Sequence, residues 1–185
     1  MATAVLTELM TAEEFGKRPD PGYPEELVQG RIVAMPLTDP RHGEVCAQAV
    51  YLLKRFLEDH DVGRAVSNDP GVVTERGPDT VRGPDVAYFS YLRIPKGPMS
   101  RGYQAVVPEL VIEVRSPSDR WPKVHVKVAE YLDAGVRVVV VLDPDPRMAH
   151  VYGQDDGPRA LSAEQDLTLP GVLDGFAVRV GKFFD

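Results

Sequence analysis

The amino-acid sequence predicts an α/β fold in which a mixed central sheet is flanked by helices, with extra short strands near the termini. Residues 110–115 and 136–142 are apolar runs of strand length, and residues 122–134 between them follow a helical pattern. A strand, a helix and a second strand in this order usually form a right-handed crossover between parallel strands. A longer helical pattern over residues 40–59 adds a second helix. The 16 glycines and 17 prolines among 185 residues indicate many turns between short strands.

The first elements of the chain begin with helix-start and turn signals. The motif Thr11-Ala-Glu-Glu14 is a capping box, whose threonine is the N-cap and whose last glutamate lies at the third helical position, so we expect a short helix there. Residues 26–35 have the pattern of two short strands around a Gln-Gly turn. Asp39 as N-cap and Pro40 at the first helical position then open the longer helix.

The middle and the end of the chain are expected to be rich in strands. Three apolar segments separated by turn residues are each predicted to be a strand: 63–66, 71–75 and 81–89. Residues 90–108 form a long predicted loop with several prolines and glycines, and loops of this length are uncommon unless they have a function. Residues 148–152 and 166–185 are predicted to form short strands and a C-terminal flap.

Glu113 is the most informative single residue for function. Alternation along residues 110–115 places Val111, Glu113 and Arg115 on one face of the predicted strand. If helices cover both faces of the sheet, this carboxylate is inside the protein, which is unfavourable unless it is paired or binds a cation. The alternative is an exposed edge strand on which Glu113 simply pairs with Arg115.

Three further residues are candidates, and each also has a purely structural interpretation. Asp85 follows Pro84 at the start of a strand segment, where an aspartate is often only a turn residue. Glu26 lies at the front of a short strand, where an exposed hairpin charge is the simpler interpretation. His42 lies in the first turn of the longer helix, where it either hydrogen-bonds locally or contacts a phosphate.

The segment after Glu113 is basic in an otherwise acidic chain. The formal net charge is −7 and the pI is about 5.1, which excludes a general nucleic-acid coat protein. The segment from residue 115 to residue 127, however, has one acidic side chain, Asp119, and four basic ones: Arg115, Arg120, Lys123 and Lys127. Lys123 and Lys127 share one face of the predicted helix. This patch is either a solvated helix face or a surface that holds a phosphodiester backbone.

Composition removes several other classes of protein. The one cysteine, Cys46, excludes an internal disulfide framework and a multi-cysteine zinc site, and fits a reducing cytoplasm. The chain has no apolar run long enough for a transmembrane helix and no basic N-terminal region typical of a signal peptide, so we expect a cytoplasmic protein without membrane contact. A serine or cysteine nucleophile is not expected, because Cys46 lies on a helix whose apolar face is core and Ser116 and Ser118 have no obvious base nearby. The length predicts one domain over residues 1–185.

The order of several motifs resembles the bacterial Uma-two family of endonucleases, which belongs to the PD-(D/E)XK nuclease superfamily. The motifs that carry the resemblance run from about residue 9 to the C-terminus: Glu26-Leu-Val-Gln-Gly-Arg31, His42, Arg82-Gly-Pro-Asp-Val86, Pro108-Glu-Leu-Val-Ile-Glu-Val-Arg-Ser-Pro-Ser118, Lys127-Val-Ala-Glu-Tyr131 and Val141-Leu-Asp-Pro144. Each motif is short, and the combination is what is specific. The resemblance implies a restriction-endonuclease-like core.

The resemblance also implies a Mg²⁺- or Mn²⁺-dependent hydrolysis of DNA phosphodiester bonds. Asp85 then matches the first acid of the superfamily motif and Glu113 the second, and both would be metal ligands. Glu26 matches an upstream acidic position. The motif lysine usually stands two residues after the second acid, where this chain has Arg115. In the family the lysine has moved to the following helix, which indicates Lys127.

The resemblance leaves several alternatives open. Lys123 lies one turn before Lys127 and would serve nearly as well, while His42, Arg115 and Lys123 are candidates for phosphate binding. Superfamily members often dimerise, so a homodimer is possible. The acidic pI and the arginine at position 115 favour a different class, a catalytically silent nuclease-like domain that binds nucleic acid or protein. A phosphoesterase acting on a small nucleotide is a third hypothesis.

Overall fold

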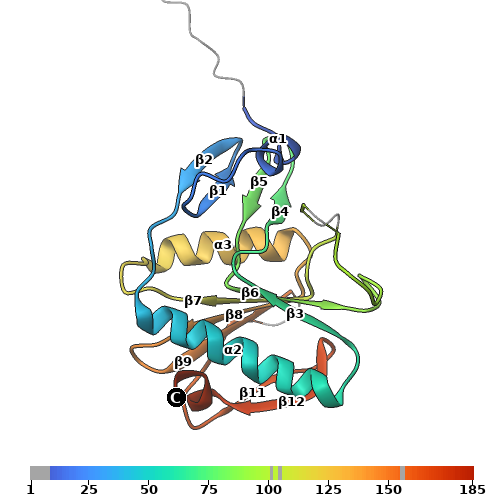
Figure 1. Cartoon of the computed structure of the whole chain (residues 1–185). Helices are drawn as coiled ribbons and strands as arrows, with labels where there is room; N and C mark the ends of the chain where they lie inside the picture. The colour runs from blue at the N-terminus through green and yellow to red at the C-terminus, as the bar shows by residue number, and fades with distance from the viewer. Residues whose placement is uncertain (1–8, 101, 104–105, 155–156) are drawn as a thin grey trace, which may run out of the picture.

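The computed structural model describes residues 9–100, 102–103, 106–154 and 157–185 (Figure 1). Most of the N-terminal segment considered as a signal peptide therefore lies outside the described residues, as do three positions of the predicted loop 90–108. The described part of residues 91–108 contains turns and bends but no helix or strand, as expected. Across the described ranges, no helix has the length and apolar character needed to cross a membrane.

A six-stranded mixed sheet forms the centre of the molecule. Its strands are β3 (Gly63–Ser67), β6 (Val86–Ser90), β7 (Leu110–Val114), β8 (Val138–Asp143), β9 (Met148–Gly153) and β10 (Arg159–Leu161). They lie in the order β10-β9-β8-β7-β6-β3, and only β7 and β8 are parallel neighbours. Helix α3 (Trp121–Asp133) joins these two strands, so the predicted strand–helix–strand unit is confirmed.

Helices cover both faces of this sheet (Figure 1). Helix α2 (Pro40–Asp59) is amphipathic and buries one stripe of side chains on one face: His42, Val45, Ala49, Leu52 and Leu53. Helix α3 covers the opposite face through Val128 and Tyr131. The alternation of β7 matches this arrangement, because Leu110 and Ile112 belong to the core under α2 and Val111 to the core under α3. The predicted fold class, a mixed sheet flanked by helices, is confirmed.

The C-terminal strands complete the core under α2. The hairpin of β11 (Asp166–Leu169) and β12 (Leu173–Arg179) leads into the 3₁₀ helix η1 (Val180–Phe184). Their apolar side chains join the same core as α2, including Phe176, Phe183 and Phe184. The predicted C-terminal flap is therefore a packed part of the core.

A second sheet of four strands lies beyond α3 (Figure 1). It has the order β2-β1-β5-β4 and consists of β1 (Glu25–Val28), β2 (Arg31–Ala34), β4 (Val72–Glu75) and β5 (Thr80–Arg82), with the short helix α1 (Ala12–Gly16) beside it. The β1–β2 turn at Gln29 and Gly30 has φ values of +50° and +72°, which glycine adopts readily. Thr11 caps α1 in the predicted capping box.

The expectation of one strand over residues 81–89 is wrong. The structure divides this segment into β5 and β6, which belong to different sheets, and residues 83–85 pass from one sheet to the other. Pro84 has no N–H to donate to a ladder, which favours a break at this point. Gly83 packs closely on Asp69, since a Cβ at residue 83 would lie 2.9 Å from the Asp69 Cβ. The division places Asp85 at the junction of the two sheets.

Candidate functional site

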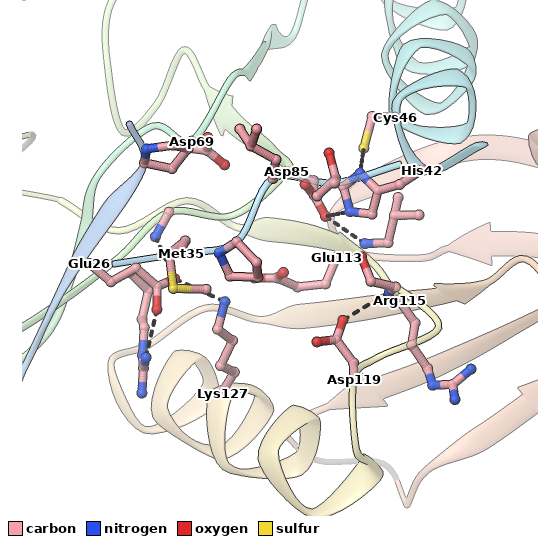
Figure 2. Close-up of a pocket in the computed structure, with 18 of the residues that line it drawn as sticks. Glu26, Met35, His42, Cys46, Asp69, Asp85, Glu113, Arg115, Asp119 and Lys127 are labelled. Carbon is pink, nitrogen blue, oxygen red and sulfur yellow. Dashed lines mark hydrogen bonds and ion pairs between the residues drawn. The ribbon is translucent and has the colours of Figure 1, made fainter. Parts of the chain in front are cut away.

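A cleft of about 1850 Å³ opens at this junction, between the four-stranded sheet, the ends of β6 and β7, and the helices α2 and α3. All the residues singled out from the sequence line it: Glu26, His42, Asp85, Glu113, Arg115, Lys123 and Lys127. Figure 2 shows Glu26, Asp85, Glu113 and Lys127 in this cleft, on segments that are far apart in the chain. Asp85 directly precedes β6 and Glu113 lies on β7, and these two strands are paired neighbours.

Asp85 is fixed in place by hydrogen bonds at the end of the central sheet. Its Oδ2 accepts a 2.7 Å hydrogen bond from the backbone N–H of Val114, the residue directly after Glu113. The same oxygen lies 3.4 Å from Nε2 of His42. Burial alone would lower the pKa of His42, but the Asp85 carboxylate outweighs it and the pKa is raised. Asp85 is therefore held beside Glu113 and is not merely a turn residue.

Glu113 lies on the interior strand β7, so the alternative of an exposed edge strand is wrong. Its Oε1 accepts a 2.7 Å hydrogen bond from the Tyr131 hydroxyl of α3. Burial raises the pKa of Glu113 to about 7; the Lys127 charge opposes this shift, and the Asp85 charge adds to it. Burial of Glu113 and repulsion from the Asp85 charge therefore outweigh the effect of the Lys127 charge.

Glu26, in contrast, is surrounded by cations. Its carboxylate is only 3% exposed, so the interpretation as an exposed hairpin charge is wrong. It accepts hydrogen bonds from Lys127 Nζ at 2.9 Å and from Arg82 at 2.7 Å. Arg82 also donates two hydrogen bonds to Glu130 on α3, at 2.6 and 2.9 Å. Burial opposes ionisation, but Lys127 and Arg82 together bring the pKa of Glu26 below its usual value.

Lys127 is held by this network with its charge directed into the cleft (Figure 2). Burial would lower its pKa, but Glu113 and Glu26 outweigh that effect, and the pKa of Lys127 is raised. The ammonium group therefore stays protonated. Lys123 is exposed on the same helix and lines the cleft, but the ion pair with Glu26 belongs to Lys127.

Arg115 stands at the position where the superfamily motif usually has its lysine, but its guanidinium group has other partners in the structure. It forms a 2.8 Å ion pair with Asp143, which is only 4% exposed, and lies over the Trp121 ring at 5.4 Å. Of the three candidates for phosphate binding, Lys123 therefore keeps a solvent-exposed side chain, while His42 and Arg115 have carboxylate partners.

Two cleft residues were not assigned a functional role from the sequence. Asp69, at φ +53°, follows Asn68 in a left-handed turn, and burial together with the Asp85 charge raises its pKa. Its Asn-Asp-Pro-Gly motif indicated only a turn. Cys46 lies 3.4 Å from Nδ1 of His42. The spacing of four residues on one helix was the signal that joins Cys46 to His42.

Comparison with known proteins agrees with this fold. Among solved structures, the chain is similar to a "putative nuclease belonging to DUF820" from Anabaena variabilis ATCC 29413, with a TM-score of 0.79, and the match covers 95% of this chain and 97% of that chain. The two sequences are 21% identical, so this likeness concerns the fold alone. No curated protein matches the chain at a significant level.

A model of the Uma2 family, described as "Putative restriction endonuclease", matches residues 12–181. Because this match spans most of the chain, the protein belongs to the Uma2 family, as its motifs indicated.

Proposed function

We propose that this protein is a Mg²⁺-dependent endonuclease that hydrolyses DNA phosphodiester bonds. The observation that carries the proposal is the meeting of Asp85, Glu113, Glu26 and Lys127 in one cleft. The family description supports a nuclease, and therefore a hydrolase with a nucleic-acid substrate. The metal ion, the preference for DNA and the role of each residue are the parts that we add.

Asp85 and Glu113 are the residues that would hold the metal ion. Their donors are carboxylate oxygens, which Mg²⁺ prefers and Mn²⁺ also accepts. The raised pKa of Glu113 fits this assignment, because burial and the Asp85 charge both disfavour the carboxylate anion and a bound cation would stabilise it. When bound, such an ion acts as a Lewis acid and lowers the pKa of the water that attacks phosphorus.

Lys127 would supply the fixed positive charge of the reaction. Its ion pair with Glu26 holds the ammonium group in place and keeps it protonated, so we assign it to charge stabilisation and not to proton abstraction. Negative charge gathers on the phosphate oxygens in the transition state, and a preorganised cation stabilises that charge. The engagement of Arg115 with Asp143 supports Lys127 over Arg115 in this role. Lys123 would contact the DNA backbone.

The test is plasmid cleavage in Mg²⁺ or Mn²⁺ by the wild type and by Asp85→Asn and Glu113→Gln. We expect each variant to lose at least about a thousandfold in rate, because each removes a metal ligand. Glu44→Gln is the control, since Glu44 is an exposed residue of α2 whose carboxylate pairs with Arg41. Cleavage by either ligand variant at the wild-type rate would contradict the assignment. Wild-type protein that binds DNA but cleaves nothing with either metal would favour the catalytically silent alternative.

The homodimer stays a prediction. Strand β2 is an edge of the four-stranded sheet, and its Ile32 and Val33 are 37% and 42% exposed. An exposed apolar edge of this kind is where strand pairing between copies would occur. Sedimentation equilibrium of the wild type and of Val33→Lys measures whether copies associate there.

A further inference from the structure

A second set of potential metal ligands lies beside the proposed Mg²⁺ pair. Within the described residues, one ligand atom each of His42, Cys46 and Asp85 lies within 4.8 Å of the others. His42 and Cys46 are four residues apart on α2, so both side chains project from the same face of that helix. Asp85 reaches this face from the start of β6, and Figure 2 shows the contacts from Cys46 through His42 to Asp85.

The chemistry of these three groups differs from that of the carboxylate pair. A thiolate, an imidazole and a carboxylate suit Zn²⁺, whereas Mg²⁺ takes oxygen ligands and waters. In a tetrahedral zinc site, bonds of about 2.3 Å to sulfur and 2.0 Å to nitrogen place neighbouring ligand atoms about 3.5 Å apart. The Cys46 Sγ–His42 Nδ1 and His42 Nε2–Asp85 Oδ2 distances are both 3.4 Å. One ion takes only one imidazole nitrogen, so one of these two contacts opens when the ion binds.

We propose that His42, Cys46 and Asp85 form a Zn²⁺ site that shares Asp85 with the Mg²⁺ pair. All three residues line the cleft, which gives the ion a path from solvent. The three protein ligands leave the fourth tetrahedral position to water. Because Asp85 belongs to both sets, Zn²⁺ in this site withdraws a ligand from Mg²⁺ and inhibits cleavage. The Zn²⁺ site stands on these side chains alone, while the inhibition rests on the proposed function.

The direct test uses Co²⁺ as a spectroscopic probe of the reduced protein in a thiol-free buffer. Cys46 is the one cysteine of the chain, so a thiolate-to-cobalt charge-transfer band in the near ultraviolet reports on this residue. We expect the band in the wild type, its loss in Cys46→Ser, and its displacement by Zn²⁺. Absence of the band in the wild type would overturn the proposal.

Zn²⁺ affinity then tests the complete ligand set by isothermal titration. We expect Cys46→Ser, His42→Gln and Asp85→Asn each to weaken binding at least about tenfold. His125→Gln is the matched control, because His125 lies on α3 outside the cluster and should leave the affinity unchanged. Equal affinity in the wild type and in Cys46→Ser would reject the site. Cys46→Ala, with its melting temperature measured, provides a second substitution if the serine variant does not fold.

Cleavage assays separate this proposal from the proposed function. We expect Zn²⁺ to inhibit Mg²⁺-dependent cleavage by the wild type, and Cys46→Ser to keep that cleavage but lose most of its sensitivity to Zn²⁺. Cleavage that Zn²⁺ inhibits equally in both proteins would overturn the shared-ligand inference and leave the proposed nuclease intact. A wild type without any cleavage would reject the nuclease, while the Co²⁺ band and the Zn²⁺ affinities would still decide the site.

Discussion

Glu26 and Glu113 lie on two sides of the same cleft, and their carboxylates have opposite electrostatic surroundings. Glu26 accepts hydrogen bonds from two cations, Lys127 and Arg82, and its pKa falls despite its burial. Burial and the neighbouring Asp85 charge raise the pKa of Glu113 to about 7, although the Lys127 charge and the hydrogen bond from the Tyr131 hydroxyl oppose the shift. Burial is common to both residues. The difference shows that direct ion pairs with cations decide whether a desolvated carboxylate has a lowered or a raised pKa.

The largest effect on stability is expected on the Glu26 side. Arg82 is 8% exposed and bridges Glu26 to Glu130, so Arg82→Met removes one of the two cations that pair with Glu26 and the arginine that pairs with Glu130. Breaking a buried ion pair from one side destabilises by about 3–5 kcal/mol. Urea unfolding measures this loss. The control is Arg76→Met, because Arg76 is largely exposed and an exposed pair contributes about 1 kcal/mol or less. Equal losses in the two variants would contradict the importance of the Glu26 network.

Lys127 connects the two sides of the cleft, and its removal should separate catalysis from binding. Lys127→Met removes the preorganised charge, so single-turnover cleavage should fall by about 10²–10³ while DNA affinity changes little. Arg115→Met should instead reduce stability, because Asp143 loses its partner in a buried position. Single-turnover kinetics, filter binding and urea unfolding of both variants measure the difference. Loss of turnover in a stable Arg115→Met protein, with Lys127→Met still active, would show that Arg115 keeps the role of the motif lysine.

The dependence of stability on pH should have opposite signs for the two glutamates. The pKa of Glu113 is raised from 4.5 to about 7, so its stabilising contribution is present below about pH 4.5 and is lost as the pH rises through 7. The pKa of Glu26 is lowered, so its contribution is present above about pH 4.5 and is lost in more acidic solution. In EDTA, the melting temperature of Glu113→Gln relative to that of the wild type should therefore rise as the pH increases from 4.5 to 7.

Glu26→Gln provides the opposite case in the same melting experiment. The melting temperature of this variant should be lower than that of the wild type at neutral pH and should approach the wild-type value at acidic pH. Mg²⁺ at about 100 times its Kd should stabilise the wild type by about 2.7 kcal/mol and stabilise Glu113→Gln much less. A parallel pH dependence for both variants would remove the electrostatic contrast on which this comparison depends.

The smallest effect is expected at Lys123, which lines the cleft without belonging to either carboxylate network. If its exposed ammonium group contacts one phosphate, Lys123→Ala weakens DNA binding modestly and reduces the slope of log K against log salt by about 0.9. Fluorescence anisotropy at several salt concentrations measures the slope. An unchanged slope would mean that Lys123 makes no phosphate contact.

The sequence by itself determined the elements whose signals are local. A capping box, an N-cap aspartate followed by proline, and a strand–helix–strand pattern depend on residues within a few positions of one another. These signals placed α1, α2 and α3 close to their observed bounds. Alternation along β7 likewise placed Glu113 on the same face as Val111, which the structure shows to be the face under α3, because side chains of a strand alternate whatever the strand packs against.

Only the tertiary structure decided the partners of the charged residues and the break between β5 and β6. Lys127 pairs with Glu26 of the four-stranded sheet, and Arg115 pairs with Asp143, although Glu113 is the acid nearest to it in sequence. Nothing in the local sequence distinguishes these partners, because the distances are set when the two sheets and the two helices pack together. The same packing brings Asp69 and Cys46 to the cleft, and it gives Glu26 and Glu113 opposite pKa shifts.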